Sequence, residues 1–225
     1  IGLVFFARRM LEMYPDSRYA DVMEQALYNT VLSGMALDGK SFFYVNPLEV
    51  LPEACHKDER KFHVKDIRQK WFGCACCPPN LARTLSSVSS YAFTENDDTL
   101  FVHLYIGSDV KKKVNGQEVA VHIDSAFPWD GKVTVSVDGA NVPLTLALRI
   151  PGWANSYTVS ADSSEYTIKD GYLYISRTWK KDETLTLDFP MEIQVWNADP
   201  RVREDIGKAA VTRGPITYCL EEKDN

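Results

Sequence analysis

The sequence predicts a chain in two parts, with α-helices first and an all-β domain after them, which places it in the α+β class. Apolar residues recur at every third or fourth position over the first part, and at every second position from Thr99 onward. The polar stretch 94–98 separates the two patterns. We therefore expect a helical domain at 1–95 and a β-sandwich domain at 96–225, the second of which need not be complete.

Two helices joined by a short turn are expected at the start of the chain. The apolar positions expected to form the buried face of the first helix are Leu3, Phe6, Met10 and Met13. Pro15 ends this pattern, because proline cannot continue a helix. A second helix is expected over 19–31, with Asp16 or Ser17 as its N-cap.

A long loop and a third helix are expected next. Residues 38–70 lose the helical period and carry turn residues, which predicts a loop region that builds a site. Pro78 and Pro79 suit the first turn of a helix. The apolar positions expected to be buried in that helix are Leu81, Leu85, Val88 and Tyr91.

The second half of the chain has the pattern of many short strands separated by Gly, Pro, Asn and Asp. We expect strands at 99–106, 118–123, 132–137, 144–150, 172–176, 184–189, 192–196 and 209–212. Short strands at fairly even spacing predict a β-sandwich or jelly roll. Four residues with strand patterns are expected in its core: Trp153, Trp179, Trp196 and Cys219.

The composition excludes some classes of partner. With 25 Lys and Arg against 31 Asp and Glu, the net charge is −6, so no basic surface for nucleic acid is expected. The apolar runs are shorter than the roughly 20 residues of a membrane-spanning helix. The chain begins at Ile1 inside an apolar helical pattern, as if cut from a longer protein. Five cysteines, three of them within four positions, favour reduced thiols in a reducing compartment, and so a cytoplasmic location.

The chemically active feature is the cysteine cluster Cys74, Cys76 and Cys77. The last two precede a helix start, where free N–H groups and the helix dipole stabilise an anion. A thiolate is both a nucleophile and a zinc ligand. The competing interpretation is that these cysteines are small buried apolar residues. It does not readily explain why three cysteines occur within four consecutive positions.

One cluster cannot close a tetrahedral zinc site. Cys74, Cys76 and Cys77 could supply two or three ligands, and the others would come from another segment or from Cys55, His56 or His63. The two histidines flank a charged run and are more typical of solvated surface residues.

Five segments together resemble glycoside hydrolase family 127, the β-L-arabinofuranosidases: 38–40, 43–49, 71–80, 149–153 and 213–215. The resemblance runs over nearly the whole chain. It implies the last helices of an (α/α)6-barrel catalytic domain followed by an all-β sandwich. It also implies a retaining, zinc-dependent hydrolase that releases β-L-arabinofuranose or a related furanose from a carbohydrate.

The resemblance assigns roles to four residues. Cys76 would be the nucleophile and a zinc ligand, and Cys77 a second zinc ligand, while Glu24 and Tyr44 would bind the sugar. The other two zinc ligands, in a Glu-x-Cys motif, and the glutamate acid/base would precede this chain. The isolated chain is then expected to be inactive.

Four further expectations stand beside this one. The main alternative is a noncatalytic carbohydrate-binding or interaction sandwich with a structural cysteine metal site. Without the resemblance, a solvated helix charge for Glu24 and loop packing for Tyr44 would be preferred. A thiol redox protein ranks last, because the cluster lacks a βαβ context. For the assembly of the protein, we consider a homodimer.

Overall fold

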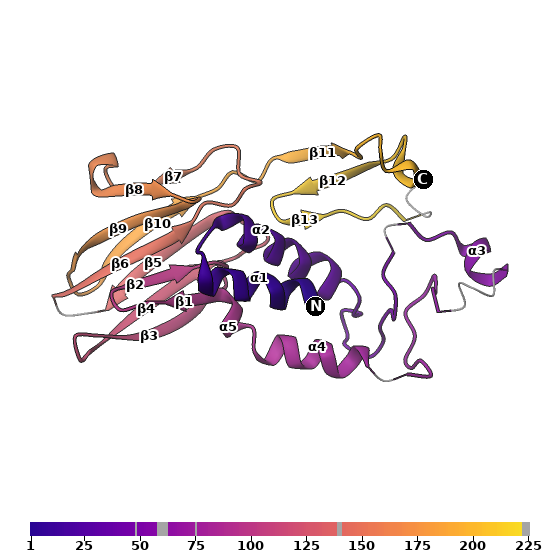
Figure 1. Cartoon of the computed structure of the whole chain (residues 1–225), viewed down its shortest axis with the longest axis horizontal. Coiled ribbons are helices and arrows are strands. Elements are labelled where there is room, and N and C mark those ends of the chain that lie inside the picture. The colour runs from indigo at the N-terminus through magenta and orange to yellow at the C-terminus, as the bar shows by residue number, and fades with distance from the viewer. Residues whose placement is uncertain (48, 58–62, 75, 139–140, 222–225) are drawn as a thin grey trace.

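The computed structural model describes residues 1–47, 49–57, 63–74, 76–138 and 141–221 (Figure 1). Its first elements are α1 (Gly2–Met13), α2 (Ser17–Gln25) and the π-helical turn η1 (Ala26–Val31). This confirms the helical hairpin, and the N-cap of α2 is Asp16, whose side chain accepts a hydrogen bond from the N–H of Arg18. The π-helical geometry of η1 was not indicated by the sequence pattern.

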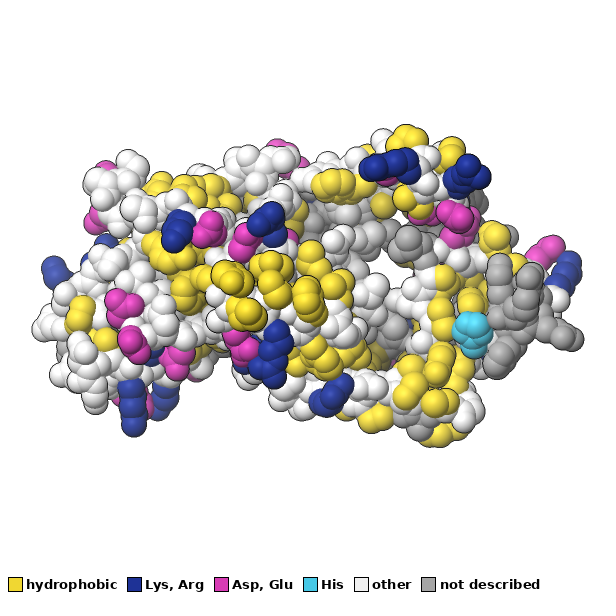
Figure 2. All heavy atoms as spheres, in the orientation of Figure 1, with side chains coloured by type: hydrophobic (Ala, Val, Ile, Leu, Met, Phe, Trp, Pro, Cys, Tyr) yellow, Lys and Arg dark blue, Asp and Glu magenta, His cyan; other side chains and the backbone are white. Residues whose placement is uncertain are grey.

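Helix α1 buries a different face from the predicted one. Val4, Ala7 and Leu11 are buried against the rest of the helical core. The predicted residues Leu3, Phe6 and Met13 are exposed, and Figure 2 shows apolar side chains gathered on this side of the molecule. Both sets have helical spacing, so periodicity alone cannot choose between them; packing against α2 decides.

The middle of the chain carries α3 (Pro52–Lys57), α4 (Cys77–Ser86) and α5 (Ser89–Ala92). The helix expected after the cysteines is therefore confirmed, with prolines in its first turn. Its predicted apolar positions are only half-buried apart from Tyr91, and the buried residue within α4 is Thr84. The long loop between η1 and α4 includes the isolated bridges of Phe42 with Met35 and Gln69.

Two five-stranded sheets form the sandwich. In spatial order, the first contains β1 (Phe93–Glu95), β2 (Thr99–Val102), β6 (Val142–Arg149), β9 (Tyr172–Trp179) and β8 (Tyr166–Lys169). The second contains β3 (Ser108–Val114), β4 (Gln117–Ser125), β5 (Lys132–Asp138), β10 (Glu183–Asp188) and β7 (Thr158–Val159). Val, Leu and Ile side chains from both sheets, with Trp179 and Phe189, fill the core between them. The expected sandwich is confirmed.

The first predicted strand is shorter than expected. It ends at Val102 rather than at 106. The N–H groups of His103 and Leu104 then share one acceptor, the carbonyl of Ala92 at the end of α5, at 2.8 and 3.3 Å, so the regular ladder with β1 stops there. Because β1 pairs with β2, the predicted domain boundary after residue 95 falls inside a hairpin; the boundary itself stays a prediction.

A third sheet of β11 (Ile193–Asn197), β12 (Ala209–Arg213) and β13 (Ile216–Thr217) stands apart from the sandwich core (Figure 1). Trp196 and Cys219 lie in and just after this sheet and are exposed, so their predicted core positions are wrong. Trp179 is buried as predicted, and Trp153 is half-buried against the core. None of the described helices has the length and apolar character needed to cross a membrane.

Candidate functional site

Two cysteine sulfurs lie side by side at the start of α4. Cys76 is the N-cap and Cys77 the first helical residue, and their Sγ atoms are 3.8 Å apart. The side chain of Asn80 donates a 2.8 Å hydrogen bond back to the carbonyl of Cys76, which fixes this turn. Cys76 is exposed and Cys77 is half-buried. The pair is therefore held by the helix start and is accessible at Cys76.

Tyr44 contacts both cysteines. Its hydroxyl oxygen lies 3.6 Å from the Sγ of Cys76, and its carbonyl oxygen lies 3.9 Å from the Sγ of Cys77. The Tyr44 ring packs on Phe72, with 5.5 Å between ring centroids. The structure thus brings together three of the four residues to which the sequence assigned a role.

The two thiols have different acidities. The hydrogen bond with Tyr44, together with Cys74 and Cys77, lowers the pKa of Cys76. The same bond raises the pKa of Tyr44 to about 12, so the phenol keeps its proton and becomes the donor when Cys76 is ionised. Burial, with Cys76 next to it, raises the pKa of Cys77 to about 11. The expectation of two easily ionised thiols therefore applies to Cys76; Cys77 needs a nearby cation before it ionises.

The spacing of the two sulfurs fits zinc. Two thiolates bound about 2.3 Å from one tetrahedral Zn²⁺ lie about 3.8 Å from each other, and the two Sγ atoms are 3.8 Å apart. In the part of the chain that the structure describes, no three His, Cys, Asp or Glu residues are grouped so that they could hold a metal. His56 instead pairs with Asp66, at 3.1 Å. The described residues thus offer half of a tetrahedral donor set.

Glu24 lies at the contact between α2 and the sandwich. Its side chain is 1% exposed. One carboxylate oxygen pairs with Arg149, and the other accepts a 2.9 Å hydrogen bond from Nε1 of Trp153. The alternative that Glu24 is a solvated helix charge is therefore wrong. Its role in binding sugar stays a prediction, and the structure gives its carboxylate a different set of partners.

The loop that carries Tyr44 is anchored at the end of η1. The N–H of Phe43 donates to the carbonyl of Gly34 at 2.8 Å, and Nδ2 of Asn46 donates to Oγ of Ser33 at 2.6 Å. The guanidinium of Arg68 donates to the carbonyl of Ser33 at 2.6 Å and covers the Phe43 ring. Residues 33–34 therefore hold both flanks of Tyr44, a role that sequence reasoning missed.

Asn29 ties η1 to the third sheet. Its Nδ2 donates to the carbonyl of Pro215 at 2.9 Å, and its Oδ1 accepts from the N–H of Thr217 at 2.8 Å. The amide thus imitates a strand partner for β13. Asparagine inside an otherwise helical pattern has a low helix propensity, and this was the one signal by which Asn29 could have been noticed.

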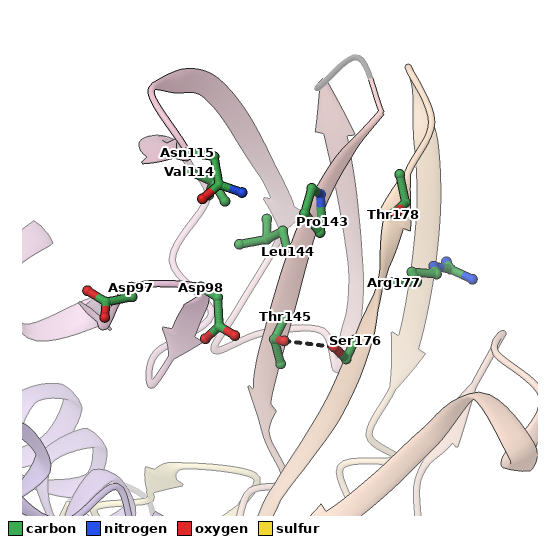
Figure 3. Close-up of a pocket in the computed structure, with 10 residues that line it drawn as sticks. All are labelled: Asp97, Asp98, Val114, Asn115, Pro143, Leu144, Thr145, Ser176, Arg177 and Thr178. Atoms are coloured by element: carbon green, nitrogen blue, oxygen red, sulfur yellow. Dashed lines mark hydrogen bonds between the residues drawn. The ribbon is translucent and has the colours of Figure 1, made fainter.

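A separate hollow lies at the end of the sandwich where β6 begins and β9 ends (Figure 3). It measures ≈ 390 Å³, and none of its ten lining residues is aromatic. Thr145 donates a 3.0 Å hydrogen bond to Ser176 across its floor, while the guanidinium of Arg177 points away and pairs with Glu183. The hollow thus offers no aromatic ring for stacking against a sugar and no inward-pointing guanidinium, so the cysteine cluster remains the stronger candidate site.

Sequence models of one protein family match almost the whole chain. The model for the β-L-arabinofuranosidase GH127 catalytic domain matches residues 1–90. The model for the GH127 middle domain matches residues 99–191, and the model for the glycoside hydrolase family 127 C-terminal domain matches residues 193–225.

Individual relatives agree with these matches. A non-reducing end β-L-arabinofuranosidase of Bifidobacterium longum subsp. longum is 38% identical over the whole chain, which spans 35% of that protein. A GH127 β-L-arabinofuranosidase from Geobacillus stearothermophilus T6 superposes with a TM-score of 0.91 at 51% identity, over 99% of this chain and 36% of that one. A GH127 β-arabinofuranosidase superposes with a TM-score of 0.88 at 35% identity, over 100% and 37%. The chain thus spans about a third of the length of these relatives.

Proposed function

Since the chain belongs to glycoside hydrolase family 127, we propose that it forms part of a retaining β-L-arabinofuranosidase and carries the catalytic nucleophile, Cys76. The proposed substrate is a β-L-arabinofuranoside or a related furanoside in a carbohydrate. The observation that carries the proposal is the accessible Cys76 thiol, with the Tyr44 hydroxyl 3.6 Å away and the Cys77 sulfur 3.8 Å away.

In the first step, the Cys76 thiolate attacks the anomeric carbon, and a C–S bond forms as the glycosidic C–O bond breaks. The departing oxygen takes a proton from a general acid, which in this proposal is a glutamate outside residues 1–225. Water then attacks the same carbon and gives a proton to that glutamate, now a carboxylate, while the C–S bond breaks and the sulfur leaves as thiolate. Two displacements at one carbon retain its configuration.

The residues of this chain prepare the nucleophile. The Tyr44 hydroxyl, hydrogen-bonded to Cys76, lowers the pKa of this thiol and so favours its thiolate form. Cys76 and Cys77 would hold zinc, which when bound stabilises thiolate and so also makes sulfur a better leaving group. Tyr44, half-buried next to the nucleophile, is the proposed sugar contact of this chain.

Replacing the nucleophile in the full-length protein tests the proposal. Cys76→Ser should lower turnover of nitrophenyl β-L-arabinofuranoside by at least about 10⁴-fold, because the weakly acidic hydroxyl does not ionise. Cys219→Ser, at an exposed position after β13, serves as the control and should keep wild-type turnover. Retained activity in Cys76→Ser would exclude Cys76 as the nucleophile.

Assays on the isolated 225-residue chain test whether the other groups that the proposal needs lie outside it. We expect no hydrolysis above background, because the general acid and two zinc ligands are missing. Robust turnover, or tight one-to-one zinc binding by this chain alone, would contradict the assignment of those groups to another segment. The alternative hypothesis, a purely structural metal site, predicts a different result. In that case Cys76→Ser would lower thermal stability and metal content without a selective loss of turnover.

A further inference from the structure

Residues 149–153, the segment Arg-Ile-Pro-Gly-Trp after β6, contact two carboxylates of α2. Asp21 and Glu24 are three positions apart and so share one face of the helix. The side chain of Arg149 is completely buried; its Nη1 pairs with Asp21 at 2.5 Å and its Nη2 pairs with Glu24. Its Nε donates to the carbonyl of His103 at 2.6 Å, so each of its three nitrogens has a partner.

Two more residues of this segment contact the same carboxylates. The N–H of Gly152 donates to Asp21 at 3.0 Å, and the indole N–H of Trp153 donates to Glu24 at 2.9 Å. A Cβ on Gly152 would lie 2.6 Å from an oxygen of Asp21, so a larger residue there would displace this carboxylate. The segment 149–153 thus matches the paired carboxylates in charge, in hydrogen-bond donors and in shape.

The helix held in this way leads directly to the proposed catalytic site. Helix α2 continues without a break into η1, and residues 33–34 follow it. Ser33 and Gly34 are hydrogen-bonded to Asn46 and Phe43, on either side of Tyr44. A displacement of α2 on the sandwich would therefore move Tyr44 relative to the Cys76 thiol.

We propose that residues 149–153 are a receptor for the Asp21 and Glu24 carboxylates, and that this contact fixes the position of Tyr44 next to Cys76. Glu24 is then a positioning residue of the proposed catalytic site and not a ligand of the sugar. The expected effect on catalysis rests on the proposed function, whereas the contact of residues 149–153 with the two carboxylates does not. The sandwich is accordingly a component of the catalytic unit and not an attached sugar-binding module.

A double-mutant cycle in the full-length protein tests the receptor. Glu24→Leu leaves the buried Arg149 guanidinium with Asp21 as its one remaining carboxylate, and Arg149→Met leaves the buried Glu24 carboxylate without a cation. Each should lower Tm by about 10 °C. Each should also lower kcat on nitrophenyl β-L-arabinofuranoside by about 100-fold, with KM within threefold, because a displacement of about 1 Å near the chemistry has such an effect. The double variant removes both charges and should regain more than half of both losses.

The exposed pair of Arg9 and Glu12 on α1 provides the control. Arg9→Met and Glu12→Leu should change Tm by less than about 2 °C, as surface ion pairs contribute little. If the single variants of the receptor do not fold, Glu24→Gln and Trp153→Phe give a milder cycle with the same expected pattern of mutual rescue.

Other outcomes would overturn the inference. A tenfold or larger rise in KM for Glu24→Leu at unchanged Tm would assign Glu24 to the sugar. Strictly additive Tm losses in the double variant would show that the two side chains do not act as one unit. If the wild-type protein does not hydrolyse arabinofuranosides, the proposed function fails, while the Tm cycle still decides whether the receptor exists.

Discussion

The sandwich core and the cysteine site differ in how their side chains are held. Core residues such as Val121, Leu146 and Trp179 are almost completely buried between two sheets. Cys76, in contrast, is exposed, and its loop partner Tyr44 is held mainly through hydrogen bonds on either side of it. The comparison shows that the reactive group is placed where substrate can reach it, while rigidity is supplied from neighbouring elements. Variants in the core should therefore change stability, and variants in the site should change chemistry.

After Cys76, the largest expected effect is at Cys77. In the full-length protein, Cys77→Ser should lower turnover by at least about 1,000-fold and remove bound zinc, because the pair loses one of its two soft donors. Zinc content by elemental analysis and turnover should fall together, whereas Cys55→Ser on α3 should change neither. A Cys77→Ser enzyme with full zinc and normal turnover would show that the site does not depend on the pair.

The core should give the opposite result. Leu146→Ala deletes a fully buried side chain and should lower the free energy of unfolding by about 3 kcal/mol, because of lost apolar burial and the cavity left behind. Tm should fall by about 10 °C, while kcat at 25 °C stays within twofold of wild type. The neighbouring Thr145→Ala on the outer face should cost less than about 1 kcal/mol. A selective loss of kcat in Leu146→Ala would remove the distinction between the two regions.

His103 provides a test by pH. It is buried, and burial with Arg149 nearby lowers its pKa to about 3, well below the roughly 6.5 of an unfolded histidine. Between these values the unfolded state binds a proton that the folded state does not, so this contribution to stability is complete above pH 6.5 and is lost as the pH falls. By pH 5 the loss should be about 2 kcal/mol.

Urea unfolding at pH 7 and pH 5 measures this loss. His103→Gln should reduce the difference in the free energy of unfolding between the two pH values. The imidazole lies 2.7 Å from Thr94 and 2.6 Å from Tyr172, and the amide of glutamine can bond to both in its place. The half-exposed His122 pairs with Asp109 at the surface, and His122→Gln should leave the difference unchanged. If wild type and His103→Gln lose the same free energy of unfolding between pH 7 and pH 5, His103 is not the titrating group.

The smallest expected effect is at Tyr44. Tyr44→Phe removes the hydroxyl that donates to the Cys76 thiolate, and kcat/KM should fall about tenfold, or about 1.4 kcal/mol. The pH midpoint of Cys76 alkylation by iodoacetamide should move upward, while Tm stays constant. Tyr14→Phe, at an exposed position beyond α1, is the matched control. An unchanged alkylation profile would contradict the hydrogen bond to the thiolate.

The sequence predicted what depends on local pattern. The helical hairpin, the helix that has Pro78 and Pro79 in its first turn, and the sandwich follow from periodicity and turn residues, and the structure confirms them. Periodicity could not choose which face of α1 is buried, because two sets of residues share the same spacing. Nor could it place Trp196, because a strand pattern does not tell whether a second sheet covers it.

For the site, the residues themselves indicated an acidic thiol at a helix start, and the family resemblance supplied the roles of Cys76, Cys77 and Tyr44. Those roles stay predictions until they are tested. The contact of Arg149 with Glu24 joins positions 125 residues apart, and no local pattern encodes such a pairing. The acidity of Cys77 was misjudged for a similar reason, since its burial depends on the fold around it.

The π-helical turn η1 gives the chain one residue more than an α-helix would use between α2 and the Tyr44 loop. In an α-helix each residue turns the chain by about 100°, whereas a π-helical turn accommodates one residue more. Deleting a single residue from 26–31 would therefore let the segment relax to an α-helix and leave Tyr44 close to its present place. The same deletion within α2 would rotate η1 and everything after it by about 100°. During evolution, η1 is accordingly the place in this hairpin where the chain can change its length by one residue.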